Sequence, residues 1–81
     1  MNTALAKDDR SYPAILKAKA TLEKITIELD DGREVSMPTA WFASLASATL
    51  EQLENMEISP AGYGIHWPDL DEDISIKAFF G

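Results

Sequence analysis

The sequence lacks cysteine and has a single histidine, and both scarcities exclude kinds of chemical site. Without cysteine the chain has no disulfides, no thiolate metal ligands and no cysteine nucleophile, which favours a reducing compartment. His66 is the lone imidazole and no serine has a distinctive context, so the nucleophile and base–orienter pair of an enzyme are missing. We therefore expect no enzymatic activity, no catalytic residues and no metal or cofactor.

Long apolar runs are also absent. No run approaches the roughly 20 apolar residues that a membrane helix needs, and residues 1–10 lack the apolar core of a signal peptide. We expect a cytoplasmic protein with no membrane partner.

Positive charge is scarce in the second half of the chain, and the net charge is −7. From residue 34 onward Lys77 is the only Lys or Arg, against Glu34, Glu51, Glu54, Glu57, Asp69, Asp71, Glu72 and Asp73. This half would repel a phosphate backbone, so we expect no direct binding of nucleic acid. The acidic surface either keeps a small protein soluble or docks a basic protein partner.

What the sequence does contain is enough apolar material for one small domain. Its 81 residues are 46% hydrophobic, near the lower size limit for folding on a single core. Residues 1–12 mix small and charged side chains without a period, and we expect a flexible N-terminal arm there. Residues 13–81 form the single domain.

Alternating polar and apolar residues predict strands. Residues 14–20 suggest a first strand with Leu16 inward, and residues 22–37 form a hairpin whose turn is Asp30-Asp31-Gly32. Residues 56–59 and 63–67 resume the extended pattern around a turn at residues 60–62, with His66 on the opposite face from Ile65 and Trp67.

Short helices are predicted between and after these strands. Residues 39–45 read as a helix capped by Thr39, with Trp41 facing the core. Thr49 and Gln52 have the spacing of a capping box for a second helix to about residue 55. Ser75 is a candidate N-cap for a last short helix that ends near Phe80.

The most distinctive stretch is residues 62–75, which contains two glycines, Tyr63, His66, Trp67, Pro68 and four carboxylates. We expect an acidic bend after Pro68. Asp69, Asp71 and Asp73 are spaced like the first ligands of a calcium loop, but Ile74 and Phe80 stand where the loop needs glycine and an acid. An aromatic beside an acidic loop is typical of a surface that anchors a protein partner. We therefore predict a partner-binding site made of Tyr63, His66, Asp69, Asp71, Glu72 and Asp73.

These motifs resemble a known bacterial family, the domain of unknown function 2442. The resemblance rests on Asp31-Gly32, Val35 with Pro38, Trp41-Phe42 with Leu45 and Ala48-Thr49, and the whole of residues 62–75. Many relatives carry Pro where this chain has Ala43, a position where both residues are tolerated.

The resemblance implies a small α+β fold and no established reaction. It also implies a two-protein arrangement like that of a toxin and its antitoxin. The second protein would be a member of the family of unknown function 4160, and this chain would be the antitoxin-like partner. Some longer relatives add a helix-turn-helix domain; we expect no such domain and no basic recognition helix here, so DNA binding is not carried over.

We expect an α+β fold with one small antiparallel sheet of four or five short strands and two or three short helices on one face. The predicted core is Leu16, Ile25, Ile27, Leu29, Val35, Met37, Trp41, Leu45, Leu53, Ile65, Trp67, Ile74 and Phe79. The expected function is a non-enzymatic protein–protein interaction module with a basic partner. The alternative is an acidic, DNA-mimic-like inhibitor of a nucleic-acid-binding protein. A homodimer through an exposed sheet edge is compatible with either.

Overall fold

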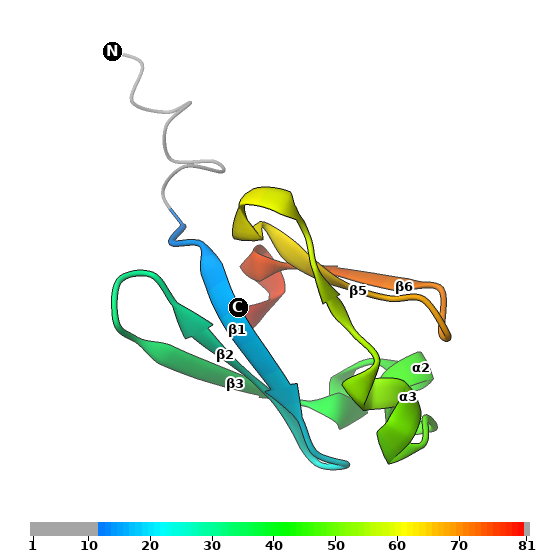
Figure 1. Ribbon diagram of the computed structural model, residues 1–81. Coiled ribbons are helices and arrows are strands. Elements are labelled where there is room, and N and C mark those ends of the chain that lie inside the picture. The colour runs from blue at the N-terminus through cyan, green and yellow to red at the C-terminus, as the bar shows by residue number, and fades with distance from the viewer. Residues whose placement is uncertain (1–11, 81) are drawn as a thin grey trace.

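The protein is an α+β domain in which two antiparallel sheets enclose one core (Figure 1). The computed structural model describes residues 12–80. The first sheet has the order β1-β2-β3, with β1 Ile15–Ala20, β2 Lys24–Leu29 and β3 Glu34–Pro38. The second has the order β4-β5-β6, with β4 Glu57–Ile58, β5 Gly64–Trp67 and β6 Glu72–Ser75.

The prediction of a single sheet of four or five strands is therefore wrong, because the structure has six strands in two sheets of three. The strand that the sequence did not predict is β6, in the segment expected to be an acidic bend. Glu72 and Asp73 are poor strand formers, but pairing of β6 with β5 places Ile74 opposite Ile65 in the core. The bend itself is shorter, and Asp71 has a positive φ of 51° there.

Two short α-helices and three 3-10 helices connect the strands. α2 is Ala43–Ala46 and α3 is Leu50–Glu54; both gather at one end of the molecule (Figure 1). The 3-10 helices are η1 Thr39–Trp41, η2 Pro60–Gly62 and η3 Ile76–Phe80. The capping box that opens α3 is confirmed, because Thr49 Oγ1 accepts from Gln52 N and Gln52 Oε1 accepts from Thr49 N.

The predicted helix over residues 39–45 is split. Phe42 has extended backbone angles between η1 and α2. Thr39 is not an N-cap: it is buried, and its hydroxyl donates to the Leu22 carbonyl oxygen at 2.8 Å. This bond attaches η1 to the turn between β1 and β2, which explains why a polar side chain lies in the core. Ser75, in contrast, does accept from the Lys77 N–H at the start of η3.

Most of the predicted core is confirmed, with two errors. Leu16 is 60% exposed and Ile15 is buried in its place, because an irregularity in the β1–β2 register between Ile15 and Lys17 reverses the expected side. Trp41 is 62% exposed, and Val35 is half-buried. The other predicted core residues are buried.

The predicted arm, residues 1–12, lies outside the described residues except for Tyr12. The Tyr12 ring packs at a tilt on Phe80 in η3, with centroids 5.4 Å apart. Within residues 12–80, no helix is long and apolar enough to cross a membrane.

Candidate functional site

The candidate site is the second sheet and the turn between β5 and β6. Strand alternation puts Ile65 and Trp67 into the core and His66 on the outer face, as predicted. Trp67 is fully buried, and its Nε1 donates to the Leu53 carbonyl oxygen at 2.9 Å. This contact holds β5 against α3, so the strand that presents His66 is firmly anchored.

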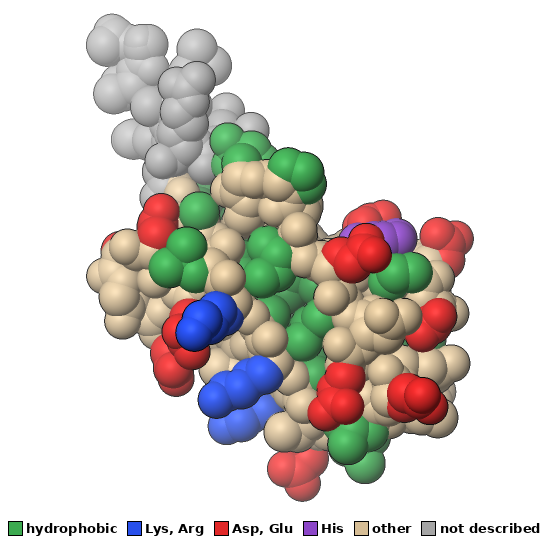
Figure 2. Space-filling model, in the orientation of Figure 1, with side chains coloured by type: hydrophobic (Ala, Val, Ile, Leu, Met, Phe, Trp, Pro, Cys, Tyr) green, Lys and Arg blue, Asp and Glu red, His purple; other side chains and the backbone are tan. Residues whose placement is uncertain are grey.

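His66 lies in the middle strand between two carboxylates. It is opposite Glu57 of β4 on one side and Asp73 of β6 on the other. Its Nδ1 is 2.8 Å from Asp73 Oδ1, with the side chains of His66 and Asp73 36% and 80% exposed. Figure 2 shows the histidine with Asp or Glu side chains on either side of it. We call Glu57, His66 and Asp73 the cross-strand row.

Glycines shape the surface beside this row. Gly64 is on the same face as His66, two residues away, and lies opposite Ser75. A side chain at Gly64 would come within 2.7 Å of the Ile74 carbonyl oxygen, so only glycine fits the packing of β5 on β6. An open hollow of about 380 Å³ results, and its lining includes Ser59, Tyr63, His66 and Asp73.

Two of the six predicted site residues are occupied by contacts that support the fold. Glu72 lies opposite Trp67, and its Oε1 accepts from the Ser44 hydroxyl of α2 at 2.6 Å. Asp69 Oδ2 accepts from Asn55 Nδ2 at 2.9 Å, at the end of α3. Both carboxylates therefore connect the β5–β6 hairpin to the helices, and Glu72 lies on the face of β6 opposite to Asp73.

The remaining predicted residues are at the surface. Tyr63 is 55% exposed and borders the hollow together with His66 and Asp73. Asp71 is exposed at the turn, with the left-handed backbone that aspartate tolerates better than most residues. Glu57 was not predicted, because β4 is two residues long and only the strand register reveals that it is opposite His66.

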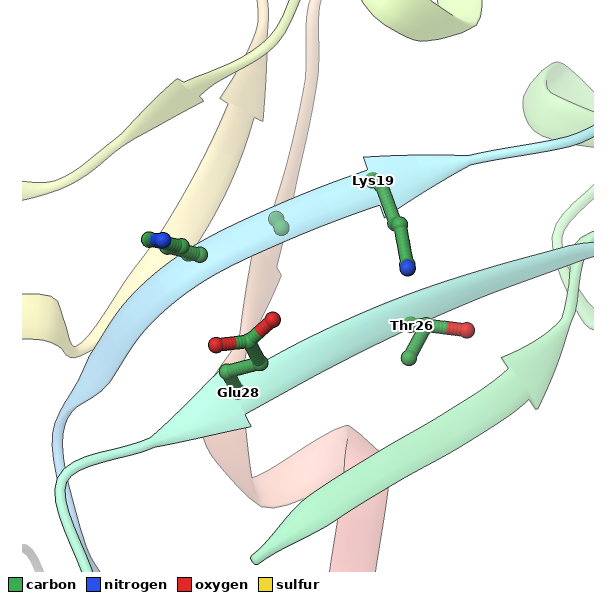
Figure 3. Close-up of a pocket in the computed structure, with 5 residues that line it drawn as sticks. Lys19, Thr26 and Glu28 are labelled. Carbon is green, nitrogen blue, oxygen red and sulfur yellow. The ribbon is translucent and has the colours of Figure 1, made fainter. Parts of the chain in front are cut away.

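Positive and negative side chains are distributed differently over the two sheets. In Figure 2 the Lys and Arg side chains lie over the first sheet, and the part of this face over the second sheet carries only acidic charge and the histidine. A second hollow, on the outer face of β1 and β2, is lined by Lys17, Lys19, Thr26 and Glu28, so its charge is mixed (Figure 3). From residue 57 to residue 75 the sequence has no Lys or Arg.

The hydroxyl groups near His66 are occupied by backbone contacts. Ser59 Oγ accepts from the Gly64 N–H at 2.9 Å, and Ser75 Oγ accepts from the Lys77 N–H at 3.1 Å. Among the described residues, no group of three or more His, Asp and Glu side chains is placed to hold a metal ion.

Comparison with known proteins gives a family match and two similar structures. The model of the family described as "Protein of unknown function (DUF2442)" matches residues 15–80. A crystal structure of a protein of unknown function from Rhodospirillum rubrum is 30% identical, with a TM-score of 0.76 over 85% of this chain and 86% of that one. The solution structure of an uncharacterized protein from Chromobacterium violaceum is 26% identical, with a TM-score of 0.75 over 99% of this chain and 78% of that one. No curated protein matched the chain.

Proposed function

The chain belongs to the DUF2442 family, and from this premise we propose that it is a non-enzymatic protein–protein interaction module with a basic protein partner. The observation that carries the proposal is the outer face of the second sheet. It presents the cross-strand row, and Tyr63, His66 and Asp73 line a hollow there. The sequence has no Lys or Arg from residue 57 to residue 75. An acidic face with an aromatic anchor suits a basic partner.

A binding role agrees with this chemistry better than an enzymatic one. The Ser59 and Ser75 hydroxyls that border the hollow accept backbone N–H groups, and His66 contacts a carboxylate rather than a nucleophile. The two-protein arrangement implied by the sequence resemblance would make this chain the antitoxin-like partner.

The test is capture of a partner from the host with a matched pair of charge variants. The site variant is Asp71→Asn with Asp73→Asn, and the control is Glu51→Gln with Glu54→Gln on α3. Each changes the net charge by the same amount, and neither removes the Glu72–Ser44 contact that supports the fold. The captured protein is identified by mass spectrometry, purified, and titrated by calorimetry against wild type and both variants.

We expect one basic protein that binds wild type and control alike and binds the site variant at least about fivefold more weakly. An acidic captured protein, or no binding at low salt, would overturn the proposal. Competition by excess duplex DNA would identify a partner that also binds nucleic acid, as the DNA-mimic alternative requires.

A homodimer through a sheet edge is compatible with this proposal. The first sheet ends in β1 and β3, and the second ends in β4 and β6. Antiparallel pairing of two β1 strands about Ala18 would place Lys17 opposite Lys19 of the second copy, which is unfavourable. Pro38, which has no N–H to donate, interrupts the edge of β3. Both features disfavour pairing between copies through the first sheet.

A further inference from the structure

We infer that the cross-strand row binds an arginine side chain of the partner, with Tyr63 packed against the guanidinium group. This inference rests on the proposed function, because it names the chemical group that the acidic face recognises. It requires three hydrogen-bond acceptors that point outward from one face and an aromatic ring beside them.

The first two acceptors are the carboxylates at the ends of the row. Residues directly opposite each other in an antiparallel pair have Cβ atoms about 5 Å apart. The Cβ atoms of Glu57 and Asp73 therefore lie about 10 Å apart, on either side of His66. Glu57 is exposed, and its carboxylate makes no hydrogen bond or ion pair within residues 12–80. Asp73 uses Oδ1 for His66, which leaves Oδ2 for a donor from outside.

The third acceptor is His66 Nε2. An ionised carboxylate only accepts hydrogen bonds, so the contact with Asp73 requires the proton on His66 Nδ1. In the neutral ring, Nε2 then carries a lone pair and accepts. With the ring neutral, the contact with Asp73 therefore directs the Nε2 lone pair of His66 outward in the middle of the row.

Tyr63 provides the aromatic surface. It is 55% exposed, it precedes Gly64, and it borders the same hollow as His66 and Asp73. The missing side chain at Gly64 leaves the floor of the hollow open between them. A cation over a tyrosine face within about 6 Å of the ring gains further attraction.

The spacing and number of acceptors favour arginine over lysine. A guanidinium group is flat and has five N–H donors, so it can bond to several acceptors in one row while it stacks on a ring. A lysine ammonium is a compact point charge with a strong hydration shell, and it gains less from dispersed acceptors.

The test uses a short serine-rich peptide with one arginine, and matched peptides with lysine or citrulline in its place. Binding to the full chain is followed by amide chemical shifts in NMR titrations. We expect the arginine peptide to shift amides of Glu57, His66 and Asp73, to bind several-fold more tightly than the lysine peptide, and to lose binding as citrulline. Glu57→Gln and Tyr63→Leu should each weaken it by about threefold to fivefold.

The control is Glu54→Gln, which removes one exposed acid of α3 that is not part of the row. The inference is overturned if lysine binds as well as arginine, or if Glu54→Gln weakens binding as much as Glu57→Gln. It is also overturned, with the proposed function left standing, if the captured basic protein binds Glu57→Gln and Tyr63→Leu as tightly as wild type. Failure to find any protein partner at low salt overturns the proposed function itself.

Discussion

The two tryptophans have opposite environments, although the sequence predicted both in the core. Trp67 is fully buried and hydrogen-bonded to the Leu53 carbonyl oxygen, whereas Trp41 is 62% exposed in η1. The difference comes from the break at Phe42, since a continuous helix would have carried Trp41 and Leu45 on one face.

Trp67→Phe should lower the free energy of unfolding by about 2 kcal/mol. It leaves a cavity and strands the buried Leu53 carbonyl oxygen without a donor. Trp41→Phe is the matched control, and it should change stability by no more than about 0.5 kcal/mol. Urea unfolding followed by far-UV circular dichroism measures both. Equal losses from the two substitutions would contradict the assigned environments.

Asp31 makes the hairpin turn sensitive to pH. The Arg33 backbone N–H and the Arg33 side chain both bond to this carboxylate and lower the pKa of Asp31 below its ordinary value. A lowered folded-state pKa stabilises the protein above the unfolded-state pKa, near 4, and this contribution is lost as the pH falls through the folded-state pKa.

Asp31→Asn should therefore be less stable than wild type near pH 6, and the difference should shrink as the pH falls below about 4. Urea unfolding of both proteins across this range gives the comparison. Asp30→Asn is the neighbouring control with the same charge change. A difference that grows toward low pH would show that the sign is wrong.

At the scale of elements, the glycines of η2 and of the hairpin turn differ in what surrounds them. Gly32 and Gly62 both have positive φ, 93° and 73°. A Cβ at Gly32 would meet open space, but one at Gly62 would lie 2.6 Å from the Ile15 backbone nitrogen and 2.8 Å from its carbonyl oxygen. Gly62 thus lets η2 of the second half touch the start of β1 in the first.

Gly32→Ala should lower the free energy of unfolding by about 1 kcal/mol, because the only unfavourable effect there is a left-handed backbone conformation for alanine. Gly62→Ala adds overpacking against β1 and should cost about 2 kcal/mol more. Thermal unfolding of the two variants beside wild type compares them directly. If the two losses were equal, the close approach of η2 to β1 would not matter to stability.

At the scale of the whole molecule, the uneven charge of the sequence becomes a difference between two sheets. Lys17, Lys19, Lys24 and Arg33 belong to the first sheet and its turn, and the cross-strand row belongs to the second. Such an arrangement orients a charged partner as it approaches.

Association with the basic partner should therefore slow by at least about tenfold between roughly 0.02 M and 0.5 M salt, with a smaller change in the dissociation rate. Stopped-flow or surface-based kinetics at several salt concentrations measures this. The control is the doubly substituted α3 variant, Glu51→Gln with Glu54→Gln, which should keep most of the salt dependence. An association rate that does not respond to salt would contradict steering by this face.

The sequence by itself determined the local features of the fold. Alternation predicted the hairpin of β2 and β3 and the outward position of His66, and the capping box predicted the start of α3. These features depend on interactions between residues close together in the chain, so a short segment of sequence is enough to predict them. Most of the buried residues followed from the same patterns.

Only the tertiary structure decided the arrangement of the candidate site. Glu57 and His66 are nine positions apart, and the strand register alone makes them neighbours. In the structure Glu72 is hydrogen-bonded to Ser44 and Asp69 to Asn55. The sequence alone does not distinguish these two acids from Asp71 and Asp73. Which acid supports the fold and which faces outward depends on contacts across 14 to 28 residues of chain. Local periodicity carries no information on such contacts.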